Sequence, residues 1–122
     1  MDSYIRPHRH RSAGSDETLV ALRGLFALMT FDDEGLVRHA APFGSERCAV
    51  EMGCALAVIV EATVWHTVLA LTPGAVLLEC KAGPFDPDAA KDLAPWAPEE
   101  GTAAAAAYLG ELRKGVVASR SA

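Results

Sequence analysis

Short apolar runs, each closed by a turn signal, follow one another through the first two thirds of the chain. Glycine or proline stands between successive runs, at Gly24, Gly35, Pro42, Gly53 and Gly74. Runs of this length, with no helix-period segment among them, are typical of antiparallel β-folds. We therefore predict an all-β protein, a closed antiparallel barrel or jelly roll, with strands at 3–10, 19–22, 25–31, 36–41, 48–52, 56–60, 66–71 and 75–81.

The composition changes after residue 82. Asp86 followed by Pro87 is a helix-start signal, which suggests a short helix or helical turn over 86–93. Thr102 can cap an alanine-rich helix over 103–114 that Gly115 can end. We predict a single domain over 1–122, with the barrel at about 3–82 and an irregular segment and short C-terminal helix at about 83–117.

Composition and charge exclude two classes of partner. The formal net charge is −5, whereas nucleic-acid binding needs clustered positive charge. The longest apolar run, 54–60, is too short to span a bilayer, and the first residues do not read as a secretory leader. We expect a cytoplasmic protein that binds neither nucleic acid nor membrane. Its three cysteines lack paired metal-ligand spacing, so we expect free thiols in the core.

Three histidines and one glutamate form a candidate metal site. Alternate side chains of a strand share a face, so His8 and His10 point the same way with Cα atoms roughly 6.6 Å apart. A turn can fold the run that Glu17 opens back beside them, and His66 begins a distant strand-like run. Together they offer the donors of one transition-metal ion. The alternative is an exposed histidine pair and a hydrogen-bonded core histidine.

The same residues resemble a known family. His8-x-His10, then Glu17 and Gly24, resembles the first motif of the cupin superfamily, and His66 stands where the second motif supplies its histidine. The wider text is similar to the WbuC-type cupin fold metalloproteins in four segments: Tyr4-Ile5-x-Pro7-His8-x-His10, Glu61-x-x-x-Trp65-His66-Thr67, Glu79-x-Lys81-x-Gly83-Pro84-Phe85 and Trp96-Ala97-Pro98-Glu99. The resemblance runs from about Ser3 to about Glu100 and implies a cupin double-stranded β-helix with the four residues as metal ligands.

The donor types do not choose among zinc, iron, nickel and manganese. Four donors can close a tetrahedral zinc site, or they can leave two positions open in an octahedral one. The cupin resemblance implies the open arrangement. A metal with open positions can polarise a carbonyl or hydroxyl oxygen, activate water or bind dioxygen.

Four other side chains are candidate substrate-binding residues. Tyr4 and Arg6 share strand parity with His8, so Arg6 could meet an anionic group and Tyr4 could donate a hydrogen bond or a proton. Glu79 and Lys81 share a face of their own run, either as an inward ligand-binding pair or as an exposed cross-strand pair. Trp65 should point away from His66, towards the core or an outer face.

The resemblance to the WbuC-type proteins implies bacterial surface polysaccharide synthesis as the setting. The first hypothesis is therefore a metal-dependent enzyme, an isomerase, epimerase or oxygenase, acting on a small polar ligand that is anionic or sugar-like, such as a sugar nucleotide. The alternatives are a metal-containing binding or sensor module without turnover, and an oxygenase that uses ferrous iron. Nothing in the sequence assigns a catalytic residue. Because similar barrels pair through edge strands, we expect a homodimer.

Overall fold

The computed structural model describes residues 2–11, 16–82 and 91–121, with side chains of the last helix as far as residue 117. The predicted all-β class with a C-terminal helix is confirmed within these residues. The elements follow one another as β1 (His8–His10), β2 (Glu17–Arg23), β3 (Leu25–Phe31), β4 (Val37–Gly44), α1 (Glu46–Met52), β5 (Ala57–Val60), β6 (Trp65–Ala70), β7 (Val76–Lys81), β8 (Lys91–Leu93) and α2 (Ala103–Ser121).

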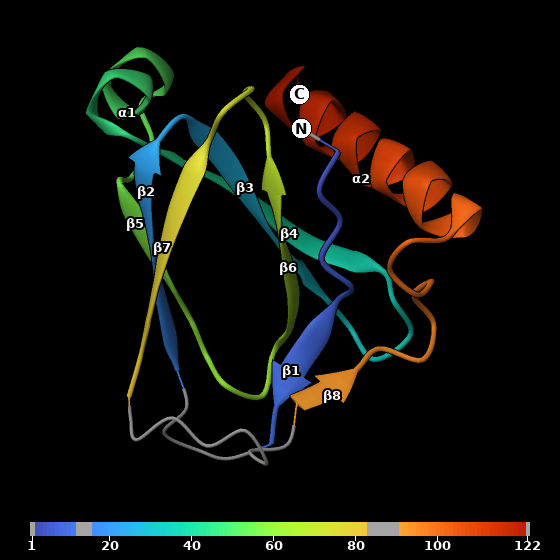
Figure 1. Cartoon of the computed structure of the whole chain (residues 1–122). Coiled ribbons are helices and arrows are strands. Elements are labelled where there is room, and N and C mark those ends of the chain that lie inside the picture. Colours follow the sequence, from blue (N-terminus) through green and yellow to red (C-terminus); the bar gives the residue numbers. More distant parts are fainter. Residues whose placement is uncertain (1, 12–15, 83–90, 122) are drawn as a thin grey trace.

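The described strands form two antiparallel sheets that face each other (Figure 1). The larger sheet has the order β4-β3-β6-β1-β8, and the smaller one has the order β5-β2-β7. An isolated bridge between Phe43 and Ala55 joins β4 to the segment just before β5. No described strand pairing joins β7 to β8, so the predicted closure into one barrel is wrong for these residues. The cupin double-stranded β-helix stays a prediction.

Gly24 lets the chain pass from the smaller sheet into the larger one. Its φ is 82°, in the left-handed region that side chains other than glycine rarely adopt. A Cβ atom at this position would lie 2.4 Å from Oγ1 of Thr72, which accepts a hydrogen bond of 3.0 Å from the Leu25 N–H. The glycine that separates the two predicted runs therefore lies where the chain changes sheets.

Alternating side chains from both sheets fill the space between them. Leu19 points inward from β2 and packs with Phe26 and Phe43 of the larger sheet, whose rings stack with centroids 5.4 Å apart. Glu17 lies two residues before Leu19 on the same buried face of β2. The carboxylate therefore stands at one end of this apolar layer.

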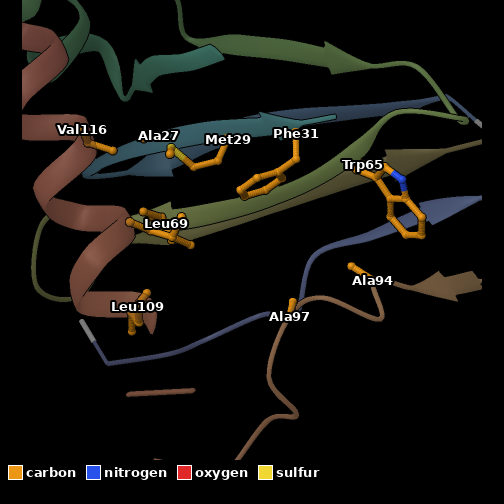
Figure 2. Close-up of a cluster of buried hydrophobic side chains, with 10 residues drawn as sticks. Ala27, Met29, Phe31, Trp65, Leu69, Ala94, Ala97, Leu109 and Val116 are labelled. Carbon is orange, nitrogen blue, oxygen red and sulfur yellow. The ribbon is translucent and has the colours of Figure 1, made fainter. Parts of the chain in front are cut away.

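The other face of the larger sheet packs against α2 (Figure 2). This second buried cluster combines strand, helix and connecting residues: Ala27, Met29, Phe31, Trp65, Leu69, Ala94, Ala97, Leu109, Leu112 and Val116. Trp65 belongs to it, which confirms the predicted core role. Because successive residues of a strand face opposite ways, His66 points back between the sheets.

Two sequence-based assignments in the middle of the chain are wrong. The predicted strand over 48–52 lies in α1, which begins after Ser45 and ends at Gly53, whose φ is 64°. Pro42 was expected to interrupt the chain, yet β4 continues through it to Gly44. Since β4 is an edge strand, the missing N–H of Pro42 can face away from the sheet.

The C-terminal third also departs from expectation. A short helix was expected over 86–93. Positions 86–90 lie outside the described residues, and Lys91–Leu93 forms a strand. Thr102 does cap α2, because its Oγ1 accepts a hydrogen bond of 3.1 Å from the Ala105 N–H. However, α2 continues through Gly115 to Ser121.

The outer face of the smaller sheet is apolar and uncovered by any described element. Leu22, Ile59 and Leu78 expose 58%, 69% and 43% of their surface. Cys80 is also exposed, while Cys48 and Cys54 are partly buried; all three thiols are free, but their predicted core placement is wrong. The homodimer stays a prediction.

Candidate metal centre

Three strands bring the four predicted donors together between the sheets. β1 carries His8 and His10, β6 carries His66, and β2 of the opposite sheet carries Glu17. His8 and His66 are directly paired across β1 and β6. One potential ligand atom from each of the four residues lies within 4.8 Å of the others. We call these residues the histidine–glutamate quartet.

The quartet is almost fully removed from solvent. The four residues are between 2% and 8% exposed, and no other buried polar residue except Thr67 is found in the described chain. Buried polar groups need partners, because leaving one unsatisfied costs about 1–3 kcal/mol. The arrangement therefore excludes the alternative of an exposed histidine pair.

Backbone carbonyls fix the orientation of two imidazoles. Nδ1 of His8 lies 3.0 Å from the Arg6 carbonyl oxygen, and Nδ1 of His66 lies 2.8 Å from the Val64 carbonyl oxygen. A carbonyl oxygen can only accept, so each Nδ1 carries the proton and donates it. The Nε2 atom of each ring is left with a free lone pair. Metal-binding histidines are commonly held in this way.

Two buried imidazole nitrogens of the quartet lack a hydrogen bond. Nε2 of His10 and Nε2 of His66 have no hydrogen-bond partner among the described residues. Both nonetheless lie beside Glu17: His10 Nε2 is in close contact with Oε1, and His66 Nε2 is 3.8 Å from Oε2. A cation placed among them would satisfy both nitrogens and the carboxylate together. The residues present thus fit a metal ion.

The electrostatics prepare the quartet for a cation. Burial lowers the pKa of His8 to about 4 and also lowers the pKa of His10, so both rings are neutral at pH 7. Burial alone would raise the pKa of Glu17. The neighbouring imidazoles of His66 and His10 and the ammonium group of Lys81 outweigh it and lower this pKa to about 2. Neutral imidazoles with an ionised carboxylate are the forms that bind metals.

Lys81 stands at the rim of the quartet. Its Nζ lies 3.4 Å from Glu17 Oε1 and 3.4 Å from His10 Nδ1. Lys81 is directly paired with Glu17 across β7 and β2, and its side chain is 44% exposed. Of the two readings for Glu79 and Lys81, the inward one holds for the lysine. The Glu79 side chain is exposed and makes no hydrogen bond or ion pair with a described residue.

Tyr4 and Arg6 contact the segment that follows β8. The Tyr4 hydroxyl donates to the Pro98 carbonyl oxygen at 2.9 Å, and the Arg6 guanidinium donates to the Ala94 carbonyl oxygen from Nε at 3.2 Å and from Nη2 at 2.8 Å. Burial raises the pKa of Tyr4 to about 12, which makes it a poor acid at neutral pH. Strand alternation does not set the direction of either side chain, because β1 begins only at His8. Neither side chain makes a hydrogen bond to the quartet among the described residues. A role for them in substrate binding stays a prediction.

Sequence reasoning missed Lys91. This residue lies in β8, directly paired with His10 across β1 and β8. Its positive charge is one of the causes, after burial, that lower the pKa of His8. A strand of three residues has too few positions for a periodic signal, so the sequence alone gave no means of finding it.

Arg9 of β1 and Arg11, which follows this strand, are paired with aspartates. Both pair with Asp92, Arg9 also lies 3.8 Å from Asp33, and the Arg9 guanidinium lies 4.2 Å from the centroid of the Trp65 ring. The pKa of Asp92 is lowered, chiefly by its hydrogen bond from Arg11. This basic cluster is therefore a paired, solvated edge of the sheet.

Comparison with known proteins gives one partial match. A family model described as a domain of unknown function, DUF6016, matches residues 1–43. The matched part contains His8, His10 and Glu17 and ends before His66. No curated protein and no solved structure matches the chain. Neither described helix combines the length and the apolar character needed to cross a lipid bilayer.

Proposed function

We propose that the protein binds one divalent transition metal ion through the histidine–glutamate quartet. The observation that supports this most directly is the state of its nitrogens. The Nδ1–H groups of His8 and His66 are held by backbone carbonyls, while the buried Nε2 atoms of His10 and His66 have no hydrogen-bond partner among the described residues. Zinc, iron, nickel and manganese all suit three imidazoles and a carboxylate.

We propose further that this centre acts on a small polar ligand. A bound metal ion would supply Lewis acidity towards a ligand oxygen or towards water. The chain contributes neutral imidazoles, an ionised carboxylate and an exposed lysine at the rim. The cupin resemblance supports a sugar or sugar nucleotide of bacterial surface polysaccharide synthesis, with an isomerase, epimerase or oxygenase reaction. Binding or sensing without turnover is the alternative use of the same centre.

Metal analysis tests the first step. Protein purified without added metal, and a second sample reloaded after chelation, should each hold about one metal ion per chain. Glu17→Gln and His66→Gln should lose most of this metal. His39→Ala is the matched control, because His39 is exposed on β4 and lies outside the quartet. Equal metal contents in the wild type and in Glu17→Gln would refute the proposal.

Ligand assays test the second step. The metal-loaded protein is incubated with sugars, sugar nucleotides and carboxylates, with product formation and oxygen uptake followed in parallel. Product formation supports the enzyme, and iron with oxygen consumption identifies the ferrous oxygenase. Saturable binding without product supports the binding or sensor module.

A further inference from the structure

Two of the three lysines in the chain stand directly across from residues of the quartet. Lys81 of β7 is paired with Glu17 of β2, and Lys91 of β8 is paired with His10 of β1. Directly paired residues of antiparallel strands project from the same face of their sheet. Both lysines therefore lie on the faces that carry the quartet, one on each sheet.

β7 and β8 are edge strands, so the lysines flank the quartet where the two sheets remain unjoined among the described residues. Lys91 is exposed, and the Lys81 side chain is 44% exposed. The side chains of His10, His66 and Glu17 are 10% exposed or less. Solvent and small molecules thus meet the lysines before they meet the quartet.

Among the described residues, the partners of the Lys81 side chain belong to the quartet. Its Nζ contacts Glu17 Oε1 and His10 Nδ1, each at 3.4 Å. A metal ion drawing on the same carboxylate would compete with Lys81 for its negative charge. The exposed ammonium group of Lys81 would then face solvent beside a second cation. Two neighbouring positive charges attract anions.

The charges at this rim leave an excess that a dianion would balance. A bound divalent ion and two ammonium groups would stand near the carboxylate of Glu17 and near Glu79, whose exposed side chain lies on the same face of β7 as Lys81. Two positive charges remain, in a chain whose formal net charge is −5. Arg9 and Arg11 are not part of this excess, because both pair with Asp92 and Arg9 also lies 3.8 Å from the carboxylate of Asp33.

We propose that Lys81 and Lys91 make the metal centre a site for a small dianion, bound with one acidic oxygen towards the metal and another towards the lysines. The inference rests on the proposed function, because the metal supplies half of the positive charge. The shared chemistry is a pair of negatively charged oxygens, which a dicarboxylate or a phosphate can provide.

The test is calorimetric titration of zinc-loaded protein, freed of unbound zinc, with succinate, inorganic phosphate and uncharged glucose. The variants are Lys81→Met, Lys91→Met, the double variant and Lys81→Arg, with circular dichroism to check folding. Lys114→Met is the matched control, because Lys114 pairs with Glu111 on the surface of α2. Zinc content is measured for every sample before and after titration.

We expect one of the two dianions to bind more tightly than glucose. The double methionine variant should weaken that binding by about tenfold to a hundredfold, while Lys81→Arg and Lys114→Met keep most of it and all variants keep their zinc. A preference for succinate identifies a carboxylate ligand, and a preference for phosphate identifies a phosphorylated one.

Two results would overturn the inference while leaving the metal proposal intact. One is a zinc-loaded wild type that binds neither dianion better than glucose. The other is a folded, zinc-loaded double variant that binds the dianion as tightly as the wild type. Failure of the wild type to hold zinc, or any other metal, would overturn both proposals together.

Discussion

Loading the quartet with metal should raise the thermal stability of the whole protein. Its donors come from β1, β2 and β6, so the unfolded chain has no preformed site. A ligand that binds only the native state at a free concentration of 100 Kd stabilises it by about 2.7 kcal/mol. Unfolding entropy is about 2.1 cal/mol/K per residue, or roughly 0.26 kcal/mol/K for 122 residues. The melting temperature should therefore rise by about 10 °C.

Differential scanning calorimetry of chelated and zinc-loaded protein measures this shift directly. If Glu17→Gln binds zinc with a hundredfold weaker Kd, zinc at the same free concentration would stabilise it by only about 0.4 kcal/mol. The rise in its melting temperature should then fall below about 2 °C. His39→Ala should keep the full rise, since His39 is exposed and outside the quartet. A wild type whose melting temperature does not rise with zinc would contradict this expectation. So would a Glu17→Gln variant whose melting temperature rises as much as that of the wild type.

Three further predictions concern the metal-free protein. The pKa of His8 is lowered by burial from 6.5 to about 4, so between these pH values His8 is protonated in the unfolded chain but neutral in the native state. The contribution of His8 to the free energy of unfolding should therefore be fully present above pH 6.5, and this free energy should fall by about 2 kcal/mol by pH 5. Urea titrations with chelator should show a smaller fall in His8→Gln. Gly24→Ala should cost about 1–3 kcal/mol in the same titration, because a side chain at a φ of 82° also meets Thr72; an unchanged midpoint would contradict the packing described. Leu69→Ala, at a site 1% exposed beneath α2, should cost about 2–5 kcal/mol, whereas Ile59→Ala, at a site 69% exposed, should cost well under half as much.

Three residues of the quartet could be predicted from the sequence because the pattern that brings them together is local. His8 and His10 needed only strand alternation, and Glu17 needed only a turn. His66 was added from its place at the start of a strand-like run and from the cupin resemblance. The structure brings all four together, with His8 and His66 paired across neighbouring strands. Occupation by a metal stays a prediction.

Other parts could not be predicted because tertiary context overrides short local patterns. The segment 48–52 is apolar enough for a strand, but in the structure it belongs to a helix that begins after Ser45 and ends at Gly53. Lys91 joins a strand of three residues whose pairing depends on β1, more than eighty positions earlier in the chain. Arg6 lies before the first strand begins, so parity said nothing about its direction.

The position of the quartet gives a bound metal a structural role as well as a chemical one. On the β4 side, the larger sheet is already joined to the segment that leads into β5, because the Gly44 N–H donates to the Ala55 carbonyl oxygen at 2.9 Å. On the other side, no described strand pairing joins β7 to β8. The histidines belong to the larger sheet and Glu17 belongs to the smaller one, so a metal shared by them would cross-link the sheets there. Removing it should therefore loosen the β7–β8 side first, and hydrogen exchange should show β1 and β7 losing protection before β3.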